Sequence, residues 1–202
     1  FLAHLGGEMA TGETETMTLT NVQNPDITGS TGTYSMTTKT GGDVTIDTAA
    51  AVSADTLTAG TLTAANVQPA SLVAGATGNA TLTFTLATAL PNNGKIVVVF
   101  PSGFDLTAVT AGSAFSSADI NGTLSTAVSG QTITITRGGG AATIISAGAV
   151  IDDLVIANVK NPTASGSTGT YRIDTRDSGN AILDQDLAVA AGWIAAGSAS
   201  GD

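Results

Sequence analysis

The 202-residue sequence lacks cysteine altogether, so disulfides and thiolate metal sites are excluded. Charged residues make up 11% of the chain, against about 25% in typical soluble domains. The net charge is −10 with only six basic residues, which form no cluster. A nucleic-acid partner needs clustered Lys and Arg, and an anionic membrane surface would repel this chain. No apolar run approaches the roughly 18 residues of a membrane-spanning helix, so we expect no membrane insertion.

Catalytic residue types are also scarce. The single histidine is His4, beside the N-terminus, whereas nucleophilic triads need a histidine placed against the nucleophile in a formed pocket. Three consecutive glycines at residues 138–140 lack the Lys-Ser/Thr that a phosphate-binding loop requires. The sequence therefore predicts a protein that is not an enzyme and has no cofactor.

What the sequence does contain is a repeat of itself. Residues 21–34 read NVQNPDITGSTGTY, and residues 158–171 read NVKNPTASGSTGTY. Ten of these fourteen positions are identical at an offset of 137 residues. Self-similarity at a fixed period is typical of arrays of structural units.

Apolar and polar residues alternate along most of the chain. Residues 81–86 place Leu82, Phe84 and Leu86 on one face and threonines on the other, and residues 131–136 follow the same pattern. This period of two is typical of half-buried strands. Turn signals recur about every 8–12 residues, as in antiparallel sandwiches. We therefore predict an all-β fold, an antiparallel Ig-like β-sandwich.

The repeat also predicts how the chain is divided. Nothing before the first copy can match residues 65–153, so residues 1–50 are expected to form a partial module and residues 51–202 a complete module with a C-terminal tail. Residues 56–63 alternate and are expected to form the first strand of the complete module. Half a sandwich cannot bury its inner face alone. Its strands could dock on the complete module, receive strands from a neighbouring subunit, or belong to a longer repetitive protein.

One segment carries a resemblance to known proteins. Residues 90–104 read LPNNGKIVVVFPSGF, a strand that ends in Phe-Pro-x-Gly-Phe after a Leu-Pro…Gly turn. This resembles the Ig-like β-sandwich repeats of large prokaryotic surface proteins, whose later strands the Asn-Pro…Gly-Thr-Tyr element also resembles. The resemblance covers roughly residues 60–187 and implies an extracellular, cell-surface, non-enzymatic module.

The sequence offers two kinds of candidate modification or ligand site. The loop at residues 174–180 could supply oxygen ligands for Ca²⁺ from Asp174, Asp177 and Asn180. The first copy lacks two of the corresponding acids, so a hairpin turn rich in Asp and Gly is the competing interpretation. Asn79 and Asn121 begin Asn-x-Thr sequons and are candidate glycosylation sites.

The leading functional hypothesis is a structural subunit of an extracellular filament or surface array. It predicts that copies of the chain form a head-to-tail homopolymer by β-strand exchange. The candidate exchanged segments are the apolar N-terminus and the C-terminal tail, with the side chains of Phe1, Leu2, Leu5, Val189, Trp193 and Ile194. The alternative is an adhesin or carbohydrate-binding module of a larger surface protein, with glycans as partners.

Overall fold

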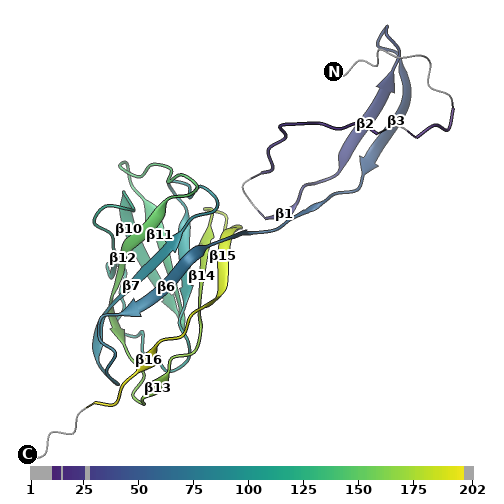
Figure 1. Ribbon diagram of the computed structural model, residues 1–202. Helices are drawn as coiled ribbons and strands as arrows, with labels where there is room; N and C mark the ends of the chain where they lie inside the picture. The colour runs from purple at the N-terminus through teal and green to yellow at the C-terminus, as the bar shows by residue number, and fades with distance from the viewer. Residues whose placement is uncertain (1–10, 15, 26–27, 198–202) are drawn as a thin grey trace, which may run out of the picture.

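All regular elements of the described chain are β-strands. The computed structural model describes residues 11–14, 16–25 and 28–197, and it contains a strand-built sandwich and a separate hairpin (Figure 1). The prediction of an all-β fold is confirmed. The described residues contain no helix. Their sequence alternates with a period of two and carries turn residues between the apolar runs, which favours strands.

Two facing sheets form the sandwich. The larger sheet has the strand order β10 (Thr123–Ser129), β11 (Thr132–Gly138), β8 (Lys95–Val99), β14 (Tyr171–Arg176), β15 (Ile182–Val189) and β5 (Gly60–Thr61). The smaller sheet has the order β6 (Thr63–Pro69), β7 (Thr77–Thr85), β12 (Val150–Lys160) and β9 (Ala114–Phe115). All pairs are antiparallel except β15 with β5.

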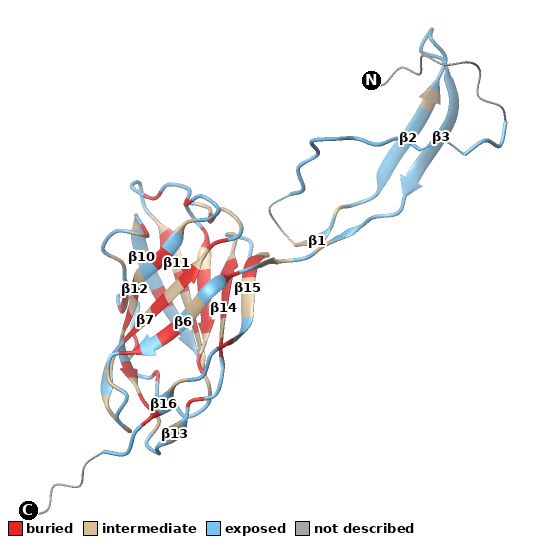
Figure 2. Cartoon of the chain, viewed as in Figure 1, coloured by how far each residue is buried: buried red, intermediate tan, exposed pale blue. Residues whose placement is uncertain are grey.

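The core lies between these sheets and follows the predicted alternation. Leu82 and Phe84 of β7 face Ile96 and Val98 of β8, and all four are at most 1% exposed. Figure 2 shows the buried residues concentrated in the sandwich. Burial of each such side chain contributes about 1.5–3 kcal/mol, so the alternating strands account for the stability of this part of the chain.

Three aromatic rings close the core at the end of β8. Phe100 and Phe104 lie with their ring centroids 5.5 and 5.7 Å from that of Tyr171, and 5.3 Å from each other. The Phe-Pro-x-Gly-Phe segment therefore packs against the tyrosine of the repeated element. Edge-on contacts of this kind add about 0.5–1.5 kcal/mol beyond the buried area.

Residues 56–63 do not form one strand, contrary to the sequence-based expectation. They contribute to β4 (Thr56–Leu57), β5 and the start of β6, which belong to three different sheets. Ala64, with φ of +52°, is the second residue of β6 and lies in the register shift between Thr63 and Asn66. Alternation identifies extended residues but carries no information about which sheet they join.

The remaining strands form three two-stranded pairs. β1 (Gly29–Ser30) pairs with β4, β2 (Tyr34–Lys39) pairs with β3 (Thr45–Val52), and β13 (Gly166–Ser167) pairs with β16 (Trp193–Ile194). The β2–β3 hairpin extends away from the sandwich, so it does not dock on the complete module (Figure 1). The predicted boundary between residues 50 and 51 lies inside β3. Residues 58–59 form the short connection between β4 and β5.

Candidate assembly surface

The four strands that follow residue 28 recur near the end of the chain at the same offset as the sequence repeat. Adding 137 to the bounds of β1, β2, β3 and β4 gives the bounds of β13, β14, β15 and β16. We call residues 16–57 the leading half-module, residues 153–194 the back half, and residues 60–152 the front half. The sandwich consists of the front half and the back half.

The pairing registers of the two copies also agree. Tyr34 pairs with Val52 as Tyr171 pairs with Val189, and Thr38 pairs with Asp47 as Thr175 pairs with Asp184. The register shifts interrupt both hairpins at the same places. The leading half-module therefore has the backbone pairing of the back half without the front half beside it.

The same side-chain hydrogen bonds and glycine conformations accompany the turn in both copies. The Thr31 hydroxyl accepts a hydrogen bond from the Asp55 amide at 3.0 Å, as the Thr168 hydroxyl does from the Gly192 amide at 2.8 Å. Gly32 and Gly169 have φ of +78° and +81°, a conformation that glycine adopts at little cost. The Gly-Ser-Thr-Gly sequence thus makes the same contacts in both copies, each time with the strand that pairs beside it.

What differs between the copies is exposure to solvent. Seven apolar side chains of the leading half-module are 38–68% exposed, and their counterparts in the back half are at most 3% exposed. They are Met17, Leu19, Val22, Tyr34, Met36, Ile46 and Val52, matching Leu154, Ile156, Val159, Tyr171, Ile173, Leu183 and Val189. Tyr34, Met36, Ile46 and Val52 lie on the paired strands β2 and β3, and the other three precede β1 outside any strand. Burying the seven would contribute on the order of 10–20 kcal/mol.

The leading half-module also has an open strand edge. In the sandwich, β14 lies between β15 and β8. In the leading half-module, the equivalent strand β2 pairs with β3 alone among the described residues. An unpaired edge presents a row of N–H and C=O groups to any strand that can reach it. Apolar face and free edge together make this a candidate assembly surface.

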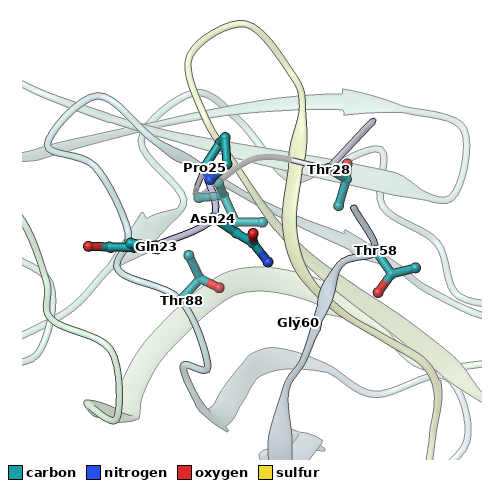
Figure 3. A pocket seen from close by; sticks show the side chains of 8 residues that line it. Gln23, Asn24, Pro25, Thr28, Thr58, Gly60 and Thr88 are labelled. Carbon is teal, nitrogen blue, oxygen red and sulfur yellow. The ribbon is translucent and has the colours of Figure 1, made fainter. Parts of the chain in front are cut away.

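A short joint connects the leading half-module to the sandwich. The Thr28 amide donates to the Ile182 carbonyl at 3.3 Å. A cavity of about 280 Å³ lies beside this contact, lined by the first Asn-Pro turn and by loops of the sandwich (Figure 3). Its lining residues are Gln23, Asn24, Pro25, Thr28, Thr58, Gly60, Thr88 and Leu183. Only residues 58–59 connect β4 to β5, so the leading half-module and the sandwich have little freedom to separate.

Gly60 packs closely in this joint. A Cβ at residue 60 would overlap the Asp184 carboxylate and lie 3.1 Å from the Cβ of Ala87. Asp184 is fully buried, and its Oδ2 accepts the amides of Ala87 and Thr88 at 3.0 and 2.9 Å. Only glycine allows β5 to approach this carboxylate so closely.

The predicted assembly residues fall in different environments. Phe1, Leu2 and Leu5 lie outside the described residues. Val189 and Ile194 are each 1% exposed and belong to the chain's own core, so exchange through them would require the back half to leave a formed sandwich. Trp193 is 67% exposed. Thr56, its counterpart at the joint, is also exposed. A role for these residues in assembly stays a prediction.

The three calcium candidates are engaged elsewhere and do not converge. The Asp174 carboxylate is buried and bound by Arg172 Nε at 2.7 Å and Arg176 Nη2 at 2.6 Å. Asp177 Oδ1 accepts the Ala181 amide at 2.8 Å, and Asn180 Oδ1 accepts a hydrogen bond from Lys95 Nζ at 2.6 Å. Two cations on one carboxylate leave it little affinity for a third, so the geometry favours the hairpin-turn interpretation.

The two sequons differ in how firmly their side chains are held. Asn121 donates from Nδ2 to Thr143 Oγ1 at 2.7 Å, and its Oδ1 accepts from Arg137 Nη2 at 2.8 Å. Asn79 is exposed on β7. A glycan on Asn121 would disrupt the contact with Thr143, whereas Asn79 is accessible.

Metal-binding clusters and membrane-spanning helices are both absent from the described residues. This part of the chain contains no group of three or more His, Cys, Asp or Glu side chains placed to hold a metal ion. His4 lies outside the described residues. Among those residues, none belongs to a helix that is long and apolar enough to span a membrane.

Comparisons with known proteins find distant structural likeness. No protein-family model matches the sequence, and no curated protein matches it. A non-cellulosomal cohesin from the hyperthermophilic archaeon Archaeoglobus fulgidus is similar with a TM-score of 0.40 and 12% identity, over 70% of this chain and 93% of the cohesin. BslA, a bacterial hydrophobin, is similar with a TM-score of 0.36 and 17% identity, over 65% of this chain and 95% of BslA. At these values neither likeness carries an argument about function.

Proposed function

We propose that this chain is a structural segment of an extracellular filament or surface array built from β-sandwich repeats joined head to tail. One observation carries the proposal: the leading half-module reproduces the strand pairing of the back half while its core-type side chains face solvent. A functional site on a self-contained domain would not need a second copy of half its fold. Repeated units that contact their neighbours are the usual basis of elongated assemblies.

The joint supports the same proposal. Two connecting residues and the Thr28–Ile182 hydrogen bond link consecutive units. A flexible linker rich in Gly and Ser would allow the units to move independently. A short packed joint instead gives each unit a defined orientation to the next, which is what a filament or a lattice requires.

The composition fits this role. The single tryptophan and 4% aromatic content leave few side chains for stacking on ligands. Threonines cover the solvent side of several strands, where they favour extended structure. The half-module is completed by strand addition, in which main-chain hydrogen bonds supply affinity and alternate side chains supply specificity.

Labelling of the native cell surface tests the proposal. Antibodies raised against residues 60–194 should decorate filaments or a continuous surface layer in negative-stain electron microscopy. Pre-adsorption of the antibody with purified protein provides the control and should abolish the label. Label found only inside cells, or only on isolated globular particles, would contradict a structural role at the surface.

A second candidate, an adhesin that binds carbohydrate, is favoured by the exposure of Trp193. The indole is 67% exposed, and the counterpart position at the joint is exposed as well, so packing of the next unit would leave it free. Exposed aromatic rings are suited to stacking on apolar sugar faces. A glycan array probed with wild-type protein and with Trp193→Ala separates the two functions: only an adhesin would show binding that the substitution removes.

A further inference from the structure

We infer that the partner of the candidate assembly surface is a front half of the same kind as residues 60–152, supplied by a neighbouring repeat of the array. The inference rests on the proposed function and adds the identity and register of the missing strands. The partner has to match three features of the leading half-module together: a strand edge, an apolar face and a polar side chain that both copies share.

The strand edge fits a copy of β8. In the sandwich, β14 pairs with β8 through Ile173 with Val98, Asp174 with Val97, and Thr175 with Ile96. The offset of 137 places Met36, Thr37 and Thr38 of β2 in the same positions. Because β2 and β3 already share the register of β14 and β15, a β8 copy would meet an edge with the geometry that β8 meets in the sandwich.

The apolar face fits the same partner. Tyr171 packs against Phe100 and Phe104 of the front half, whereas Tyr34 is 48% exposed. Every replacement between the two copies at the seven exposed positions is one apolar residue for another, the type of exchange that a packed core tolerates. Positions on the other face of the strand differ in kind, as Ser35 and Arg172 do.

The Asn-Pro turn supplies an independent polar feature. Asn161 is 3% exposed, and its Nδ2 donates to the carbonyls of Ser71 at 2.7 Å and Val73 at 3.0 Å, both in the front half. Asn24 is the counterpart of Asn161 and is exposed. A front half beside the leading half-module would bring the two carbonyl acceptors that Asn24 lacks.

Counting halves identifies the source of the partner. Each chain carries two back-half sequences, residues 16–57 and 153–194, and one front half. Exchange between copies of this chain therefore leaves one back-half sequence per copy without a front half, in any arrangement. A front half from a neighbouring repeat satisfies every unit. In an extended chain where such a front half replaces residues 1–15, no linker is needed before residue 16, because residues 152 and 153 are consecutive in the sandwich.

An extended chain tests the inference: residues 60–152 followed directly by residues 16–202. Amide hydrogen exchange in β2 and β3 should slow by about 100-fold or more relative to the original chain, because these strands become part of a closed core. Tyr34→Ala should remove this protection in the extended chain and have no effect on exchange in the original one. The matched control carries Val98→Asp in the added front half alone, and should leave the hairpin unprotected while residues 60–194 of the original module stay folded.

Two results would overturn the inference. One is an extended chain whose original sandwich is folded but whose hairpin exchanges as fast as before. The other is hairpin protection that the original chain acquires by itself as its concentration rises, which would make a second copy the partner. Neither result bears on the proposed function, since labelling of the cell surface is independent of how the half-module is completed.

Discussion

Tyr34 and Tyr171 occupy the same position in two copies of one structural element, yet 48% of the first side chain is exposed and 1% of the second. Each begins its strand and pairs with a valine, Val52 or Val189. The difference is the front half, which covers Tyr171 with two phenylalanine rings. The backbone of this element is therefore specified locally, whereas the burial of its side chains depends on a second segment.

The first prediction concerns this pair. Tyr171→Ala should lower the free energy of unfolding of the sandwich by about 3–5 kcal/mol, because it leaves a cavity in a closed core. Tyr34→Ala, the matched variant, should change it by less than about 0.5 kcal/mol, because an exposed side chain loses few contacts. Urea denaturation followed by circular dichroism measures both. Equal effects of the two substitutions would contradict this assignment of the core.

The second prediction concerns the joint. Gly60→Ala should destabilise the sandwich by about 1–3 kcal/mol, since the new methyl group overlaps the Asp184 carboxylate and crowds Ala87. Gly112→Ala is the control, because a Cβ at residue 112 meets nothing within 4 Å. Thermal unfolding of both variants provides the comparison. An unchanged melting temperature for Gly60→Ala would show that β5 can move away from β15 at little cost.

The third prediction is a pH dependence. Burial acts to raise the pKa of Asp153, but hydrogen bonds from Ser116, Ser117 and Ala118 outweigh it and hold the pKa well below its usual range. A carboxylate whose pKa is lower in the folded state stabilises the protein above its unfolded pKa, near 3.9, and loses that contribution as the pH falls toward the folded value. Wild-type stability should therefore decrease below about pH 4.

Asp153→Asn isolates this contribution. The variant should be less stable than wild type by about 1–3 kcal/mol at pH 7, because it loses acceptors for charge-assisted hydrogen bonds. The deficit should shrink toward pH 2. Asp152→Asn, at the exposed neighbouring position, serves as the control and should stay within about 0.5 kcal/mol of wild type at pH 7. Urea denaturation at several pH values measures this, and a pH-independent deficit would exclude the role of the Asp153 charge.

The fourth prediction concerns a buried cation. Arg137 is 2% exposed and donates to the carbonyls of Pro91 at 2.7 Å and Thr143 at 2.9 Å, and to Asn121 Oδ1 at 2.8 Å. Burial lowers the pKa of the guanidinium, which nonetheless stays charged. Arg137→Met should cost about 3 kcal/mol or more, because several acceptors lose their donor together.

Asn121→Ala provides the comparison for Arg137. It removes one of the three short contacts and should cost about 1–2 kcal/mol. Both variants can be measured by urea denaturation on the same samples. If Arg137→Met is as stable as wild type, the three loops that meet at Arg137 are held together by packing and not by its hydrogen bonds.

The fifth prediction separates the two sequons. In a host that glycosylates Asn-x-Thr, Asn79 should be occupied, because its side chain is exposed on β7. Asn121 should be unoccupied once the protein has folded, because its amide is held by Thr143 and Arg137. Peptide mass spectrometry gives the occupancy at each site, and Asn79→Gln should abolish the modification. Full occupancy of Asn121 would contradict the prediction.

Much of the fold could be predicted from the alternation of side chains. The segments containing Leu82, Ile96 and Ile133 were expected as strands and contribute to the core between the two sheets. Sheet membership could not be predicted, because a strand between residues 56 and 63 looks the same whichever sheet receives it. The chain there contributes to three sheets, and the packing of Gly60 on Asp184 fixes only the position of β5 beside β15.

The candidate site was visible in the sequence only in part. The repeat predicted an incomplete module. The segments predicted to be exchanged were the two termini, and not the strands of the half-module itself. Comparison of the apolar positions of the two copies would have pointed to Met36 and Ile46, since they match residues expected inside a sandwich. Whether such a residue is covered depends on distant segments, so periodicity alone cannot distinguish Tyr34 from Tyr171.

The sequence by itself determined the extended conformation, the turns and the repeat at an offset of 137. These depend on neighbouring residues: alternation, glycine with positive φ, and the serine hydroxyls of Ser30 and Ser167, which accept the amides two residues ahead. Tertiary structure alone decided which copy is buried, where the joint lies and which carboxylates already accept hydrogen bonds from arginines or backbone amides. Those properties arise from contacts between segments far apart in the chain, and only the folded arrangement of the two sheets brings those segments together.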